Sequence, residues 1–253
     1  MVWDQDFDAY LTFLDETPAS FIVDLAAAAH GPVEALARRI QIRVPLLEPR
    51  DDGLRDASEV ELLARVEDGI CELLEQRCGA RFLGHVISEG VLHVVCYADG
   101  ARIDDEASLL DGLDAGGYDI AWLVEDDPEW EMYFEFLFPD PLDFQLIQNR
   151  RMLERFADEG DQLSAERIVD HAALFDDRSA IEPAAAALRE EGFEVDEPIL
   201  DEAMRWVLGF HRPERLDEGR TDGFCLEILE LLEPFDCLYD GWGAPLIREP
   251  DTH

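Results

Sequence analysis

The sequence predicts an α+β protein of two mixed domains, residues 1–140 and 141–253, the second of which is ferredoxin-like with a linking helix before it. Three observations lead to this expectation. The 253 residues are 47% apolar, which is enough for two hydrophobic cores. Short β-rich runs alternate with segments of helical periodicity. Residues 138–143, Phe-Pro-Asp-Pro-Leu-Asp, interrupt this alternation, because two prolines with a flanking cap residue end a strand and start a helix.

In the first domain, six apolar runs have the composition of strands: residues 20–28, 40–47, 81–87, 91–97, 118–124 and 130–138. Ser58 and Glu61 form a capping box, which predicts the start of a helix that ends at Cys78-Gly79. Ser88-Glu89-Gly90 predicts a tight hairpin between two of the strands. A short helix is expected over residues 105–113.

The second domain begins with the linking helix, whose apolar residues run from Leu142 to Phe156. Six later segments then follow in order: a strand at 165–174, a helix at 179–191 closed by Gly192, strands at 194–200 and 203–210, a helix at 222–233 and a strand at 237–242. The order strand-helix-strand-strand-helix-strand is that of a ferredoxin-like fold.

The charge of the chain limits its partners. The chain has 60 acidic side chains and 20 basic ones, all of them arginine, and its formal charge is −40. Such a surface repels phosphate, which argues against direct nucleic-acid binding. Two explanations stay open: adaptation to salt or a base-composition bias, and an acidic surface that docks on a basic partner.

The sequence has no apolar run near the roughly 18 residues of a membrane span and no signal peptide. We therefore expect a soluble, cytoplasmic protein that does not bind membranes. Its five cysteines contain no C-x-x-C pair and are expected to be reduced thiols. No nucleophile elbow, phosphate loop or dinucleotide motif is present, so we expect no enzyme, no cofactor and no bound metal.

One alternative concerns a metal. If Glu89 centres its hairpin, His85 and His93 face each other across the two strands, close enough to share a metal ion. That arrangement would suit a metal-dependent hydrolase, although no clear third ligand is nearby. The other interpretation is a pair of hydrogen-bonded or half-exposed histidines.

The segment at residues 235–243, Phe-Asp-Cys-Leu-Tyr-Asp-Gly-Trp-Gly, is the most distinctive motif. Two glycines flank Trp242 and fix the direction of its indole after the last strand. The indole either closes the core with its N–H hydrogen-bonded or is presented to a partner. For the second case we predict Tyr239, Asp240 and Trp242 as partner-binding residues.

The run Tyr239-Asp240-Gly241-Trp242-Gly243 resembles the ending of the regulator of ribonuclease activity B family, bacterial protein inhibitors of ribonuclease E. The resemblance includes residues 184–195, similar to a family helix that ends in Gly-aromatic-Glu-Val, and Ile168-Val169-Asp170-His171, similar to its first strand. It covers about residues 142–247. The sequence departs from the family pattern in one respect. Acidic residues occur throughout this chain, whereas the family regulator is a short protein with an acidic tail.

The first half is similar to the domain of unknown function 695. The residues that carry this resemblance are Gly53-Leu54, Glu59 through Glu67-Asp68, Gly84 and the run from Asp127 to Tyr133. It covers about residues 1–140 and implies no activity.

The resemblance implies a non-enzymatic regulatory binding protein whose partner is a ribonuclease or another RNA-processing protein. A dense negative surface could compete for a basic RNA-binding region of that partner without contacting RNA. Two alternatives remain: the metal-dependent hydrolase, and an acidic, salt-adapted protein with an unrelated binding role.

Overall fold

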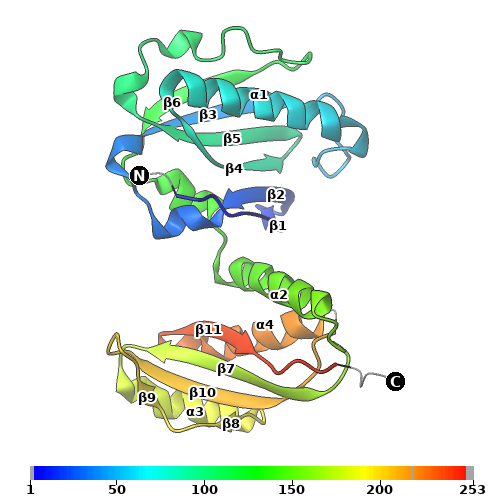
Figure 1. Ribbon diagram of the computed structural model, residues 1–253, viewed down its shortest axis with the longest axis vertical. Helices are drawn as coiled ribbons and strands as arrows, with labels where there is room; N and C mark the ends of the chain where they lie inside the picture. Colours follow the sequence, from blue (N-terminus) through cyan, green and yellow to red (C-terminus); the bar gives the residue numbers. More distant parts are fainter. Residues whose placement is uncertain (1–2, 218, 249–253) are drawn as a thin grey trace. The chain divides into compact units, whose positions relative to one another are not determined.

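The computed structural model describes residues 3–217 and 219–248. The chain separates into two compact units, Met1–Asp140 and Pro141–His253 (Figure 1). Each unit combines an antiparallel sheet with a few helices, so the protein is α+β.

The first unit contains a six-stranded sheet in the order β1-β2-β4-β5-β3-β6. Its strands are β1 (Phe7–Leu14), β2 (Thr17–Asp24), β3 (Arg38–Pro45), β4 (Arg81–Ser88), β5 (Val91–Ala98) and β6 (Ala121–Asp126). All five neighbouring pairs are antiparallel.

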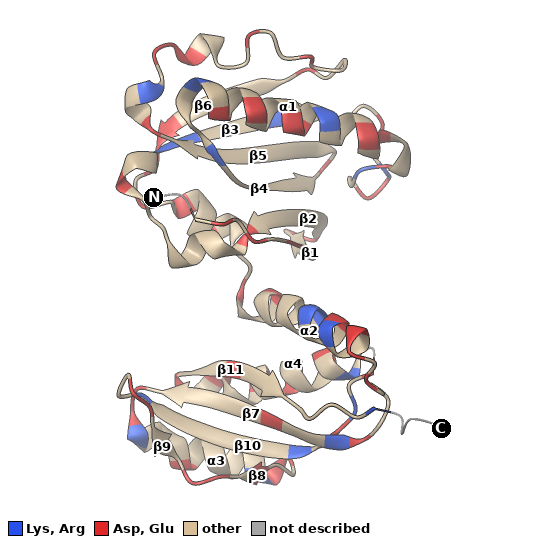
Figure 2. Cartoon of the chain, in the orientation of Figure 1, with Lys and Arg blue, Asp and Glu red and all other residues tan. Residues whose placement is uncertain are grey.

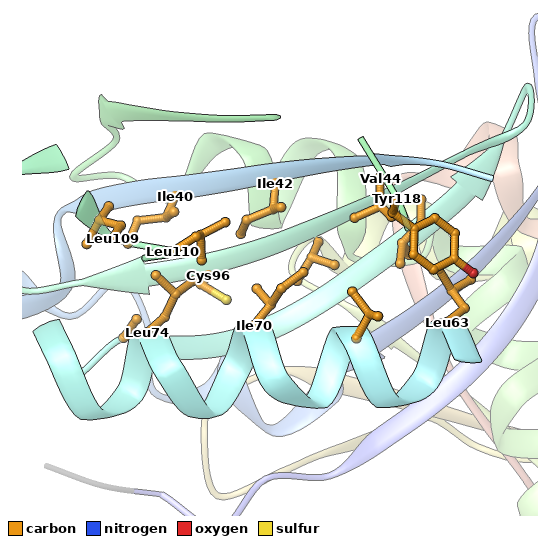
Figure 3. Packing of buried hydrophobic residues seen from close by; sticks show 14 of the residues in the cluster. Ile40, Ile42, Val44, Leu63, Ile70, Leu74, Cys96, Leu109, Leu110 and Tyr118 are labelled. Atoms are coloured by element: carbon orange, nitrogen blue, oxygen red, sulfur yellow. The ribbon is translucent and has the colours of Figure 1, made fainter. Parts of the chain in front are cut away.

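Helix α1 (Val60–Cys78) packs against this sheet because its apolar residues recur every three or four positions. Leu63, Ile70 and Leu74 are at most 1% exposed. Figure 3 shows them pointing from the helix toward strand residues such as Ile40 and Ile42, so this interface forms the core of the first unit.

The start of α1 differs from the predicted capping box. A 3-10 turn, Ala57–Glu59, precedes the helix, and the carboxylate of Asp56 accepts the backbone N–H of Ser58 at 2.9 Å. The Ser58 hydroxyl donates to the same carboxylate at 2.7 Å. Asp56 is therefore the cap, and the capping box of Ser58 with Glu61 is wrong. The helix ends as predicted at Gly79, whose φ of 65° is left-handed.

The predicted strand at residues 130–138 is wrong, because Met132–Leu137 forms a π-helix. Trp130 has a φ of 56°, which ends any extended backbone, and its indole is fully buried. Asp127 accepts the backbone N–H groups of Glu131 and Met132 at 2.8 and 3.2 Å and so caps the helical segment.

Other expectations for the first unit need smaller corrections. Strand β1 was not expected, and the segment expected to extend to residue 28 leaves the sheet at Asp24 and continues as a 3-10 helix, Leu25–Ala29. The helix expected at 105–113 is only a 3-10 turn, Glu106–Ser108.

The second unit contains a sheet in the order β11-β7-β10-β8, with β9 also paired to β10, and all of its pairs are antiparallel. Its elements are α2 (Pro141–Asp158), β7 (Arg167–Phe175), α3 (Ile181–Glu190), β8 (Glu194–Val195), β9 (Ile199–Leu200), β10 (Trp206–Glu214), α4 (Arg220–Leu232) and β11 (Cys237–Gly243).

The predicted order of elements is present, with the second strand divided into two short pieces, β8 and β9. Strand β10 begins three residues later than predicted. Asp201 and Arg205 form a turn there, in which the Asp201 carboxylate accepts the Arg205 N–H at 2.7 Å.

Alternate residues of β7 and β10 form the core with α3 and α4. Val169, Ala173, Leu208 and Phe210 are at most 1% exposed and cluster with the helices. Residues that alternate with them, such as the 44% exposed Ile168, lie on the other face of the sheet. The helices therefore cover one face of this sheet.

Candidate partner-binding site

The predicted Tyr239, Asp240 and Trp242 lie on β11, an edge strand with a bulge. The register moves between Tyr239, which pairs with Ala173, and Gly241, which pairs with Ala172. Asp240 is the extra residue, and Gly241 has a left-handed φ of 95°. Without the bulge, residues 239 and 242 would point to opposite faces of the sheet.

The bulge brings Tyr239 and Trp242 to the same side. The Trp242 Nε1–H donates to the Asn149 Oδ1 at 2.7 Å, and its ring lies 6.0 Å from the rings of both Phe156 and Phe224. The indole thus closes the core with its N–H satisfied, as in the first of the two sequence interpretations. Asp240 is exposed.

Asn149 of α2 joins three elements. It is 0% exposed, and its Oδ1 also accepts from Gln145 Nε2 at 2.9 Å and lies 3.4 Å from the Cys225 Sγ. Its Nδ2 donates to Asp222 Oδ1 at 2.9 Å. Asn149 therefore fastens β11 and α4 to α2. Asn149 was not predicted from the sequence, although an amide pair at i, i+4 next to the apolar stripe of α2 was a usable signal.

His171 of β7 holds the other aromatic residue of the motif. Its Nδ1 lies 2.8 Å from the Tyr239 hydroxyl, and its ring stacks on Phe210 at 5.3 Å. Burial, followed by the charge of Arg212, lowers the pKa of His171 to about 3. Burial also raises the pKa of Tyr239, and it raises that of the Cys225 thiol to about 12. At neutral pH these side chains are uncharged and position the motif through hydrogen bonds and packing.

A groove of about 490 Å³ runs between α2 and β11. Its lining residues come from α2, α4 and β11: Pro141, Phe144, Gln145, Gln148, Met152, Leu229, Cys237, Leu238, Tyr239, Asp240, Gly241 and Trp242. The single charged residue among them is Asp240. Leu238 is 57% exposed, so an apolar side chain is presented at the groove. The three predicted residues thus line one groove, but only Asp240 is exposed.

The histidine pair proposed as a metal site is wrong in its geometry. Glu89 and Gly90 both have positive φ and form a two-residue turn between Ser88 and Val91. This register pairs His85 with Val94 and His93 with Val86, so the two imidazoles lie on opposite faces.

Each histidine has another neighbour. His85 contacts Glu67 of α1, and the His93 Nδ1 lies 3.4 Å from Gln41 Nε2. Within residues 3–217 and 219–248, no three metal-ligating side chains of His, Cys, Asp or Glu type form a group that could hold a metal ion. The same residues include no helix long and apolar enough to span a bilayer.

Comparisons with known proteins match both halves. Residues 5–138 match a family of unknown function, DUF695, and residues 146–244 match regulator of ribonuclease activity B. Two curated relatives named "Regulator of ribonuclease activity B", from Escherichia coli (strain K12) and Shigella flexneri, are each 27% identical over 110 residues. Each match covers 42% of this chain and 80% of the relative. Both predicted resemblances are confirmed.

Similarity to solved structures is weak. An unknown protein from Galdieria sulphuraria aligns with a TM-score of 0.20 and 9% identity, covering 83% of this chain and 99% of that one. A protein from Bacteroides thetaiotaomicron aligns with a TM-score of 0.18 and 11% identity, covering 81% and 93%. These alignments do not bear on the fold.

Proposed function

We propose that this chain, which belongs to the DUF695 family of unknown function, is a non-enzymatic protein that regulates a ribonuclease by binding it through its second unit. The observation that carries this proposal is the match of residues 146–244 to regulator of ribonuclease activity B. The match to the regulator relatives covers 42% of this chain, so the proposal concerns the second unit and assigns no role to the first.

We also propose that the second unit has a ferredoxin-like fold. In chain order, β11 is the fourth strand, β7 the first, β10 the third, and β8 with β9 the second. The spatial order 4-1-3-2 with all pairs antiparallel supports a split pair of βαβ units.

The charge of the second unit supports a basic partner. Residues 141–253 include 28 acidic residues and 11 arginines, a formal charge of −17. Figure 2 shows red on the helices and loops of this unit, while the strands β7 and β10 are mostly tan. A ribonuclease has to hold RNA phosphates with cationic side chains, and the acidic surface could occupy the same cations. This mode of binding requires no contact with nucleic acid, and we propose that the protein meets its partner in the cytoplasm.

We place the contact at the groove between α2 and β11, with Tyr239, Asp240 and Trp242 as its residues. The buried Tyr239 and the partly buried Trp242 set the position of the strand, and the exposed Asp240 meets the partner. Because the indole is packed and hydrogen-bonded, its replacement would act through the shape of the groove.

A binding titration tests the proposal. The full chain is titrated with a purified ribonuclease that has a basic RNA-binding region, at about 50 and about 300 mM salt. We expect association at low salt that weakens by at least about ten-fold at the higher salt. RNA cleavage by the ribonuclease should be inhibited to the extent that the chain is bound to it. No association at low salt would remove the proposal for that enzyme. Cleavage of RNA by the chain alone would contradict a non-enzymatic role.

A further inference from the structure

The outer edge of β11 lies along the groove. The strand pairs with β7 on one side only, and six consecutive residues, Cys237 through Trp242, line the hollow on its other side. Among the residues that the structure describes, no other strand pairs with this outer edge. An unpaired strand edge presents backbone N–H and C=O groups in a row, which is a template for a further strand.

The walls of the groove suit alternate side chains of an added strand. Phe144, Met152 and Leu229 supply apolar surface, and Leu238 lies half-exposed on the strand itself. Four residues of extended chain span about 13 Å. Such a segment would run along Cys237–Tyr239 before the bulge.

Asp240 in the groove and two residues next to the lining in sequence carry negative charge without a counter-ion. Asp240 lines the groove, and Glu230 and Asp236 are adjacent in sequence to the lining residues Leu229 and Cys237. All three carboxylates are exposed, and none forms an ion pair with any residue that the structure describes. No arginine lines the groove, so its charge is complementary to a cationic ligand.

We propose that the groove binds an extended segment of the partner protein, with alternating apolar and cationic residues, which adds as a strand to the outer edge of β11. This inference rests on the proposed function and names its recognition mode. Backbone hydrogen bonds to β11 hold the segment, its apolar side chains enter the groove, and its Arg or Lys side chains meet Glu230, Asp236 and Asp240. A second copy of this chain is a poorer occupant, because two chains of charge −40 repel each other.

The test uses the full chain and a fluorescein-labelled octapeptide of alternating arginine and leucine. Two further peptides carry N-methyl groups on all leucine or on all arginine backbone nitrogens. In an extended chain these two sets of N–H groups point to opposite edges. Only the set that faces β11 forms hydrogen bonds, so one methylated peptide should bind at least about ten-fold more weakly and the other nearly unchanged. Equal affinity of all three peptides would overturn strand addition, and so would failure of the parent peptide to bind at low salt.

Leu238→Arg should weaken binding of the parent peptide by more than about ten-fold, since it removes an apolar contact and repels the cationic side chains of the peptide. Ile199→Arg is the matched control, because Ile199 is also an exposed aliphatic residue, 64% exposed, but lies on β9 away from β11. Equal effects of the two substitutions would place the peptide elsewhere and overturn the proposal. Circular dichroism checks that both variants fold, and the methylated peptides keep the test decisive if one does not.

Titration with the ribonuclease distinguishes a failure of strand addition at β11 from a failure of the proposed regulatory function. If the ribonuclease binds the full chain but the methylated peptides do not differ, strand addition is wrong and the regulatory function stands. If neither the ribonuclease nor the peptide binds, both proposals fail.

Discussion

Replacing Asn149 with leucine tests whether its amide fastens β11 to the helices. The substitution keeps the number and branching of the side-chain heavy atoms but removes the acceptor of two N–H groups, from Trp242 at 2.7 Å and from Gln145 at 2.9 Å. It also removes the donor to Asp222, an exposed residue that water can solvate. Each buried donor left without a partner costs about 1–3 kcal/mol. Because Trp242 is only partly buried, we expect a total loss of about 2–4 kcal/mol in the opening free energy of the second unit.

Native-state hydrogen exchange, followed by mass spectrometry of peptides from β7 and β11, measures this loss in the second unit alone. The double variant Asn149→Leu with Trp242→Phe provides the control, since it removes the indole donor together with its acceptor. The double variant should be more stable than the sum of the two single losses predicts, by about 1–2 kcal/mol. Strictly additive losses would refute the assignment of a stabilising hydrogen bond between these side chains.

Three other outcomes are expected. Burial lowers the pKa of His171 from 6.5 to about 3, so its contribution to stability is full above pH 6.5 and is lost as the pH falls from 6.5 toward 3. Between pH 6.5 and pH 4.5, the free energy of unfolding in urea should therefore fall by about 2–3 kcal/mol more in this chain than in the double variant His171→Phe with Tyr239→Phe. An equal fall in both proteins would contradict the role assigned to His171. Asp127→Ala removes a helix cap and the acceptor of a buried tyrosine hydroxyl and should cost about 2–4 kcal/mol in urea unfolding, whereas the exposed Asp126→Ala should cost under about 0.5. Because burial raises the pKa of Cys225 to about 12, iodoacetamide at about pH 8 should modify it only after unfolding, and rapid modification of the native chain, read by mass spectrometry, would show that this core opens.

Local patterns predicted most of the elements. The apolar spacing of α1 predicted its buried face, and Gly79 predicted its end. Both features depend on residues within the helix or next to it. The two prolines at 139 and 141 coincide with the division into two units. In the second half, the order of helices and strands followed from turn residues and apolar runs.

The errors arose where distant contacts decide the structure. Trp130 lies in a run with strand composition, but its indole N–H donates to the Leu36 carbonyl at 2.7 Å and the ring is buried, which the local pattern does not encode. The Asn149 hydrogen bond to Trp242 joins residues 93 positions apart. A turn of two residues in place of three was enough to move His85 and His93 to opposite faces.

The bulge at Asp240 constrains how this segment can vary. If Asp240 paired in regular register instead of bulging, the indole would rotate to the opposite side of the strand and leave the amide of Asn149 facing a void. Substitution of Asp240 by another exposed residue would leave the backbone path unchanged. The bulged backbone between the two rings is thus under stricter control than the side chain at position 240, which could vary while the framework stays the same.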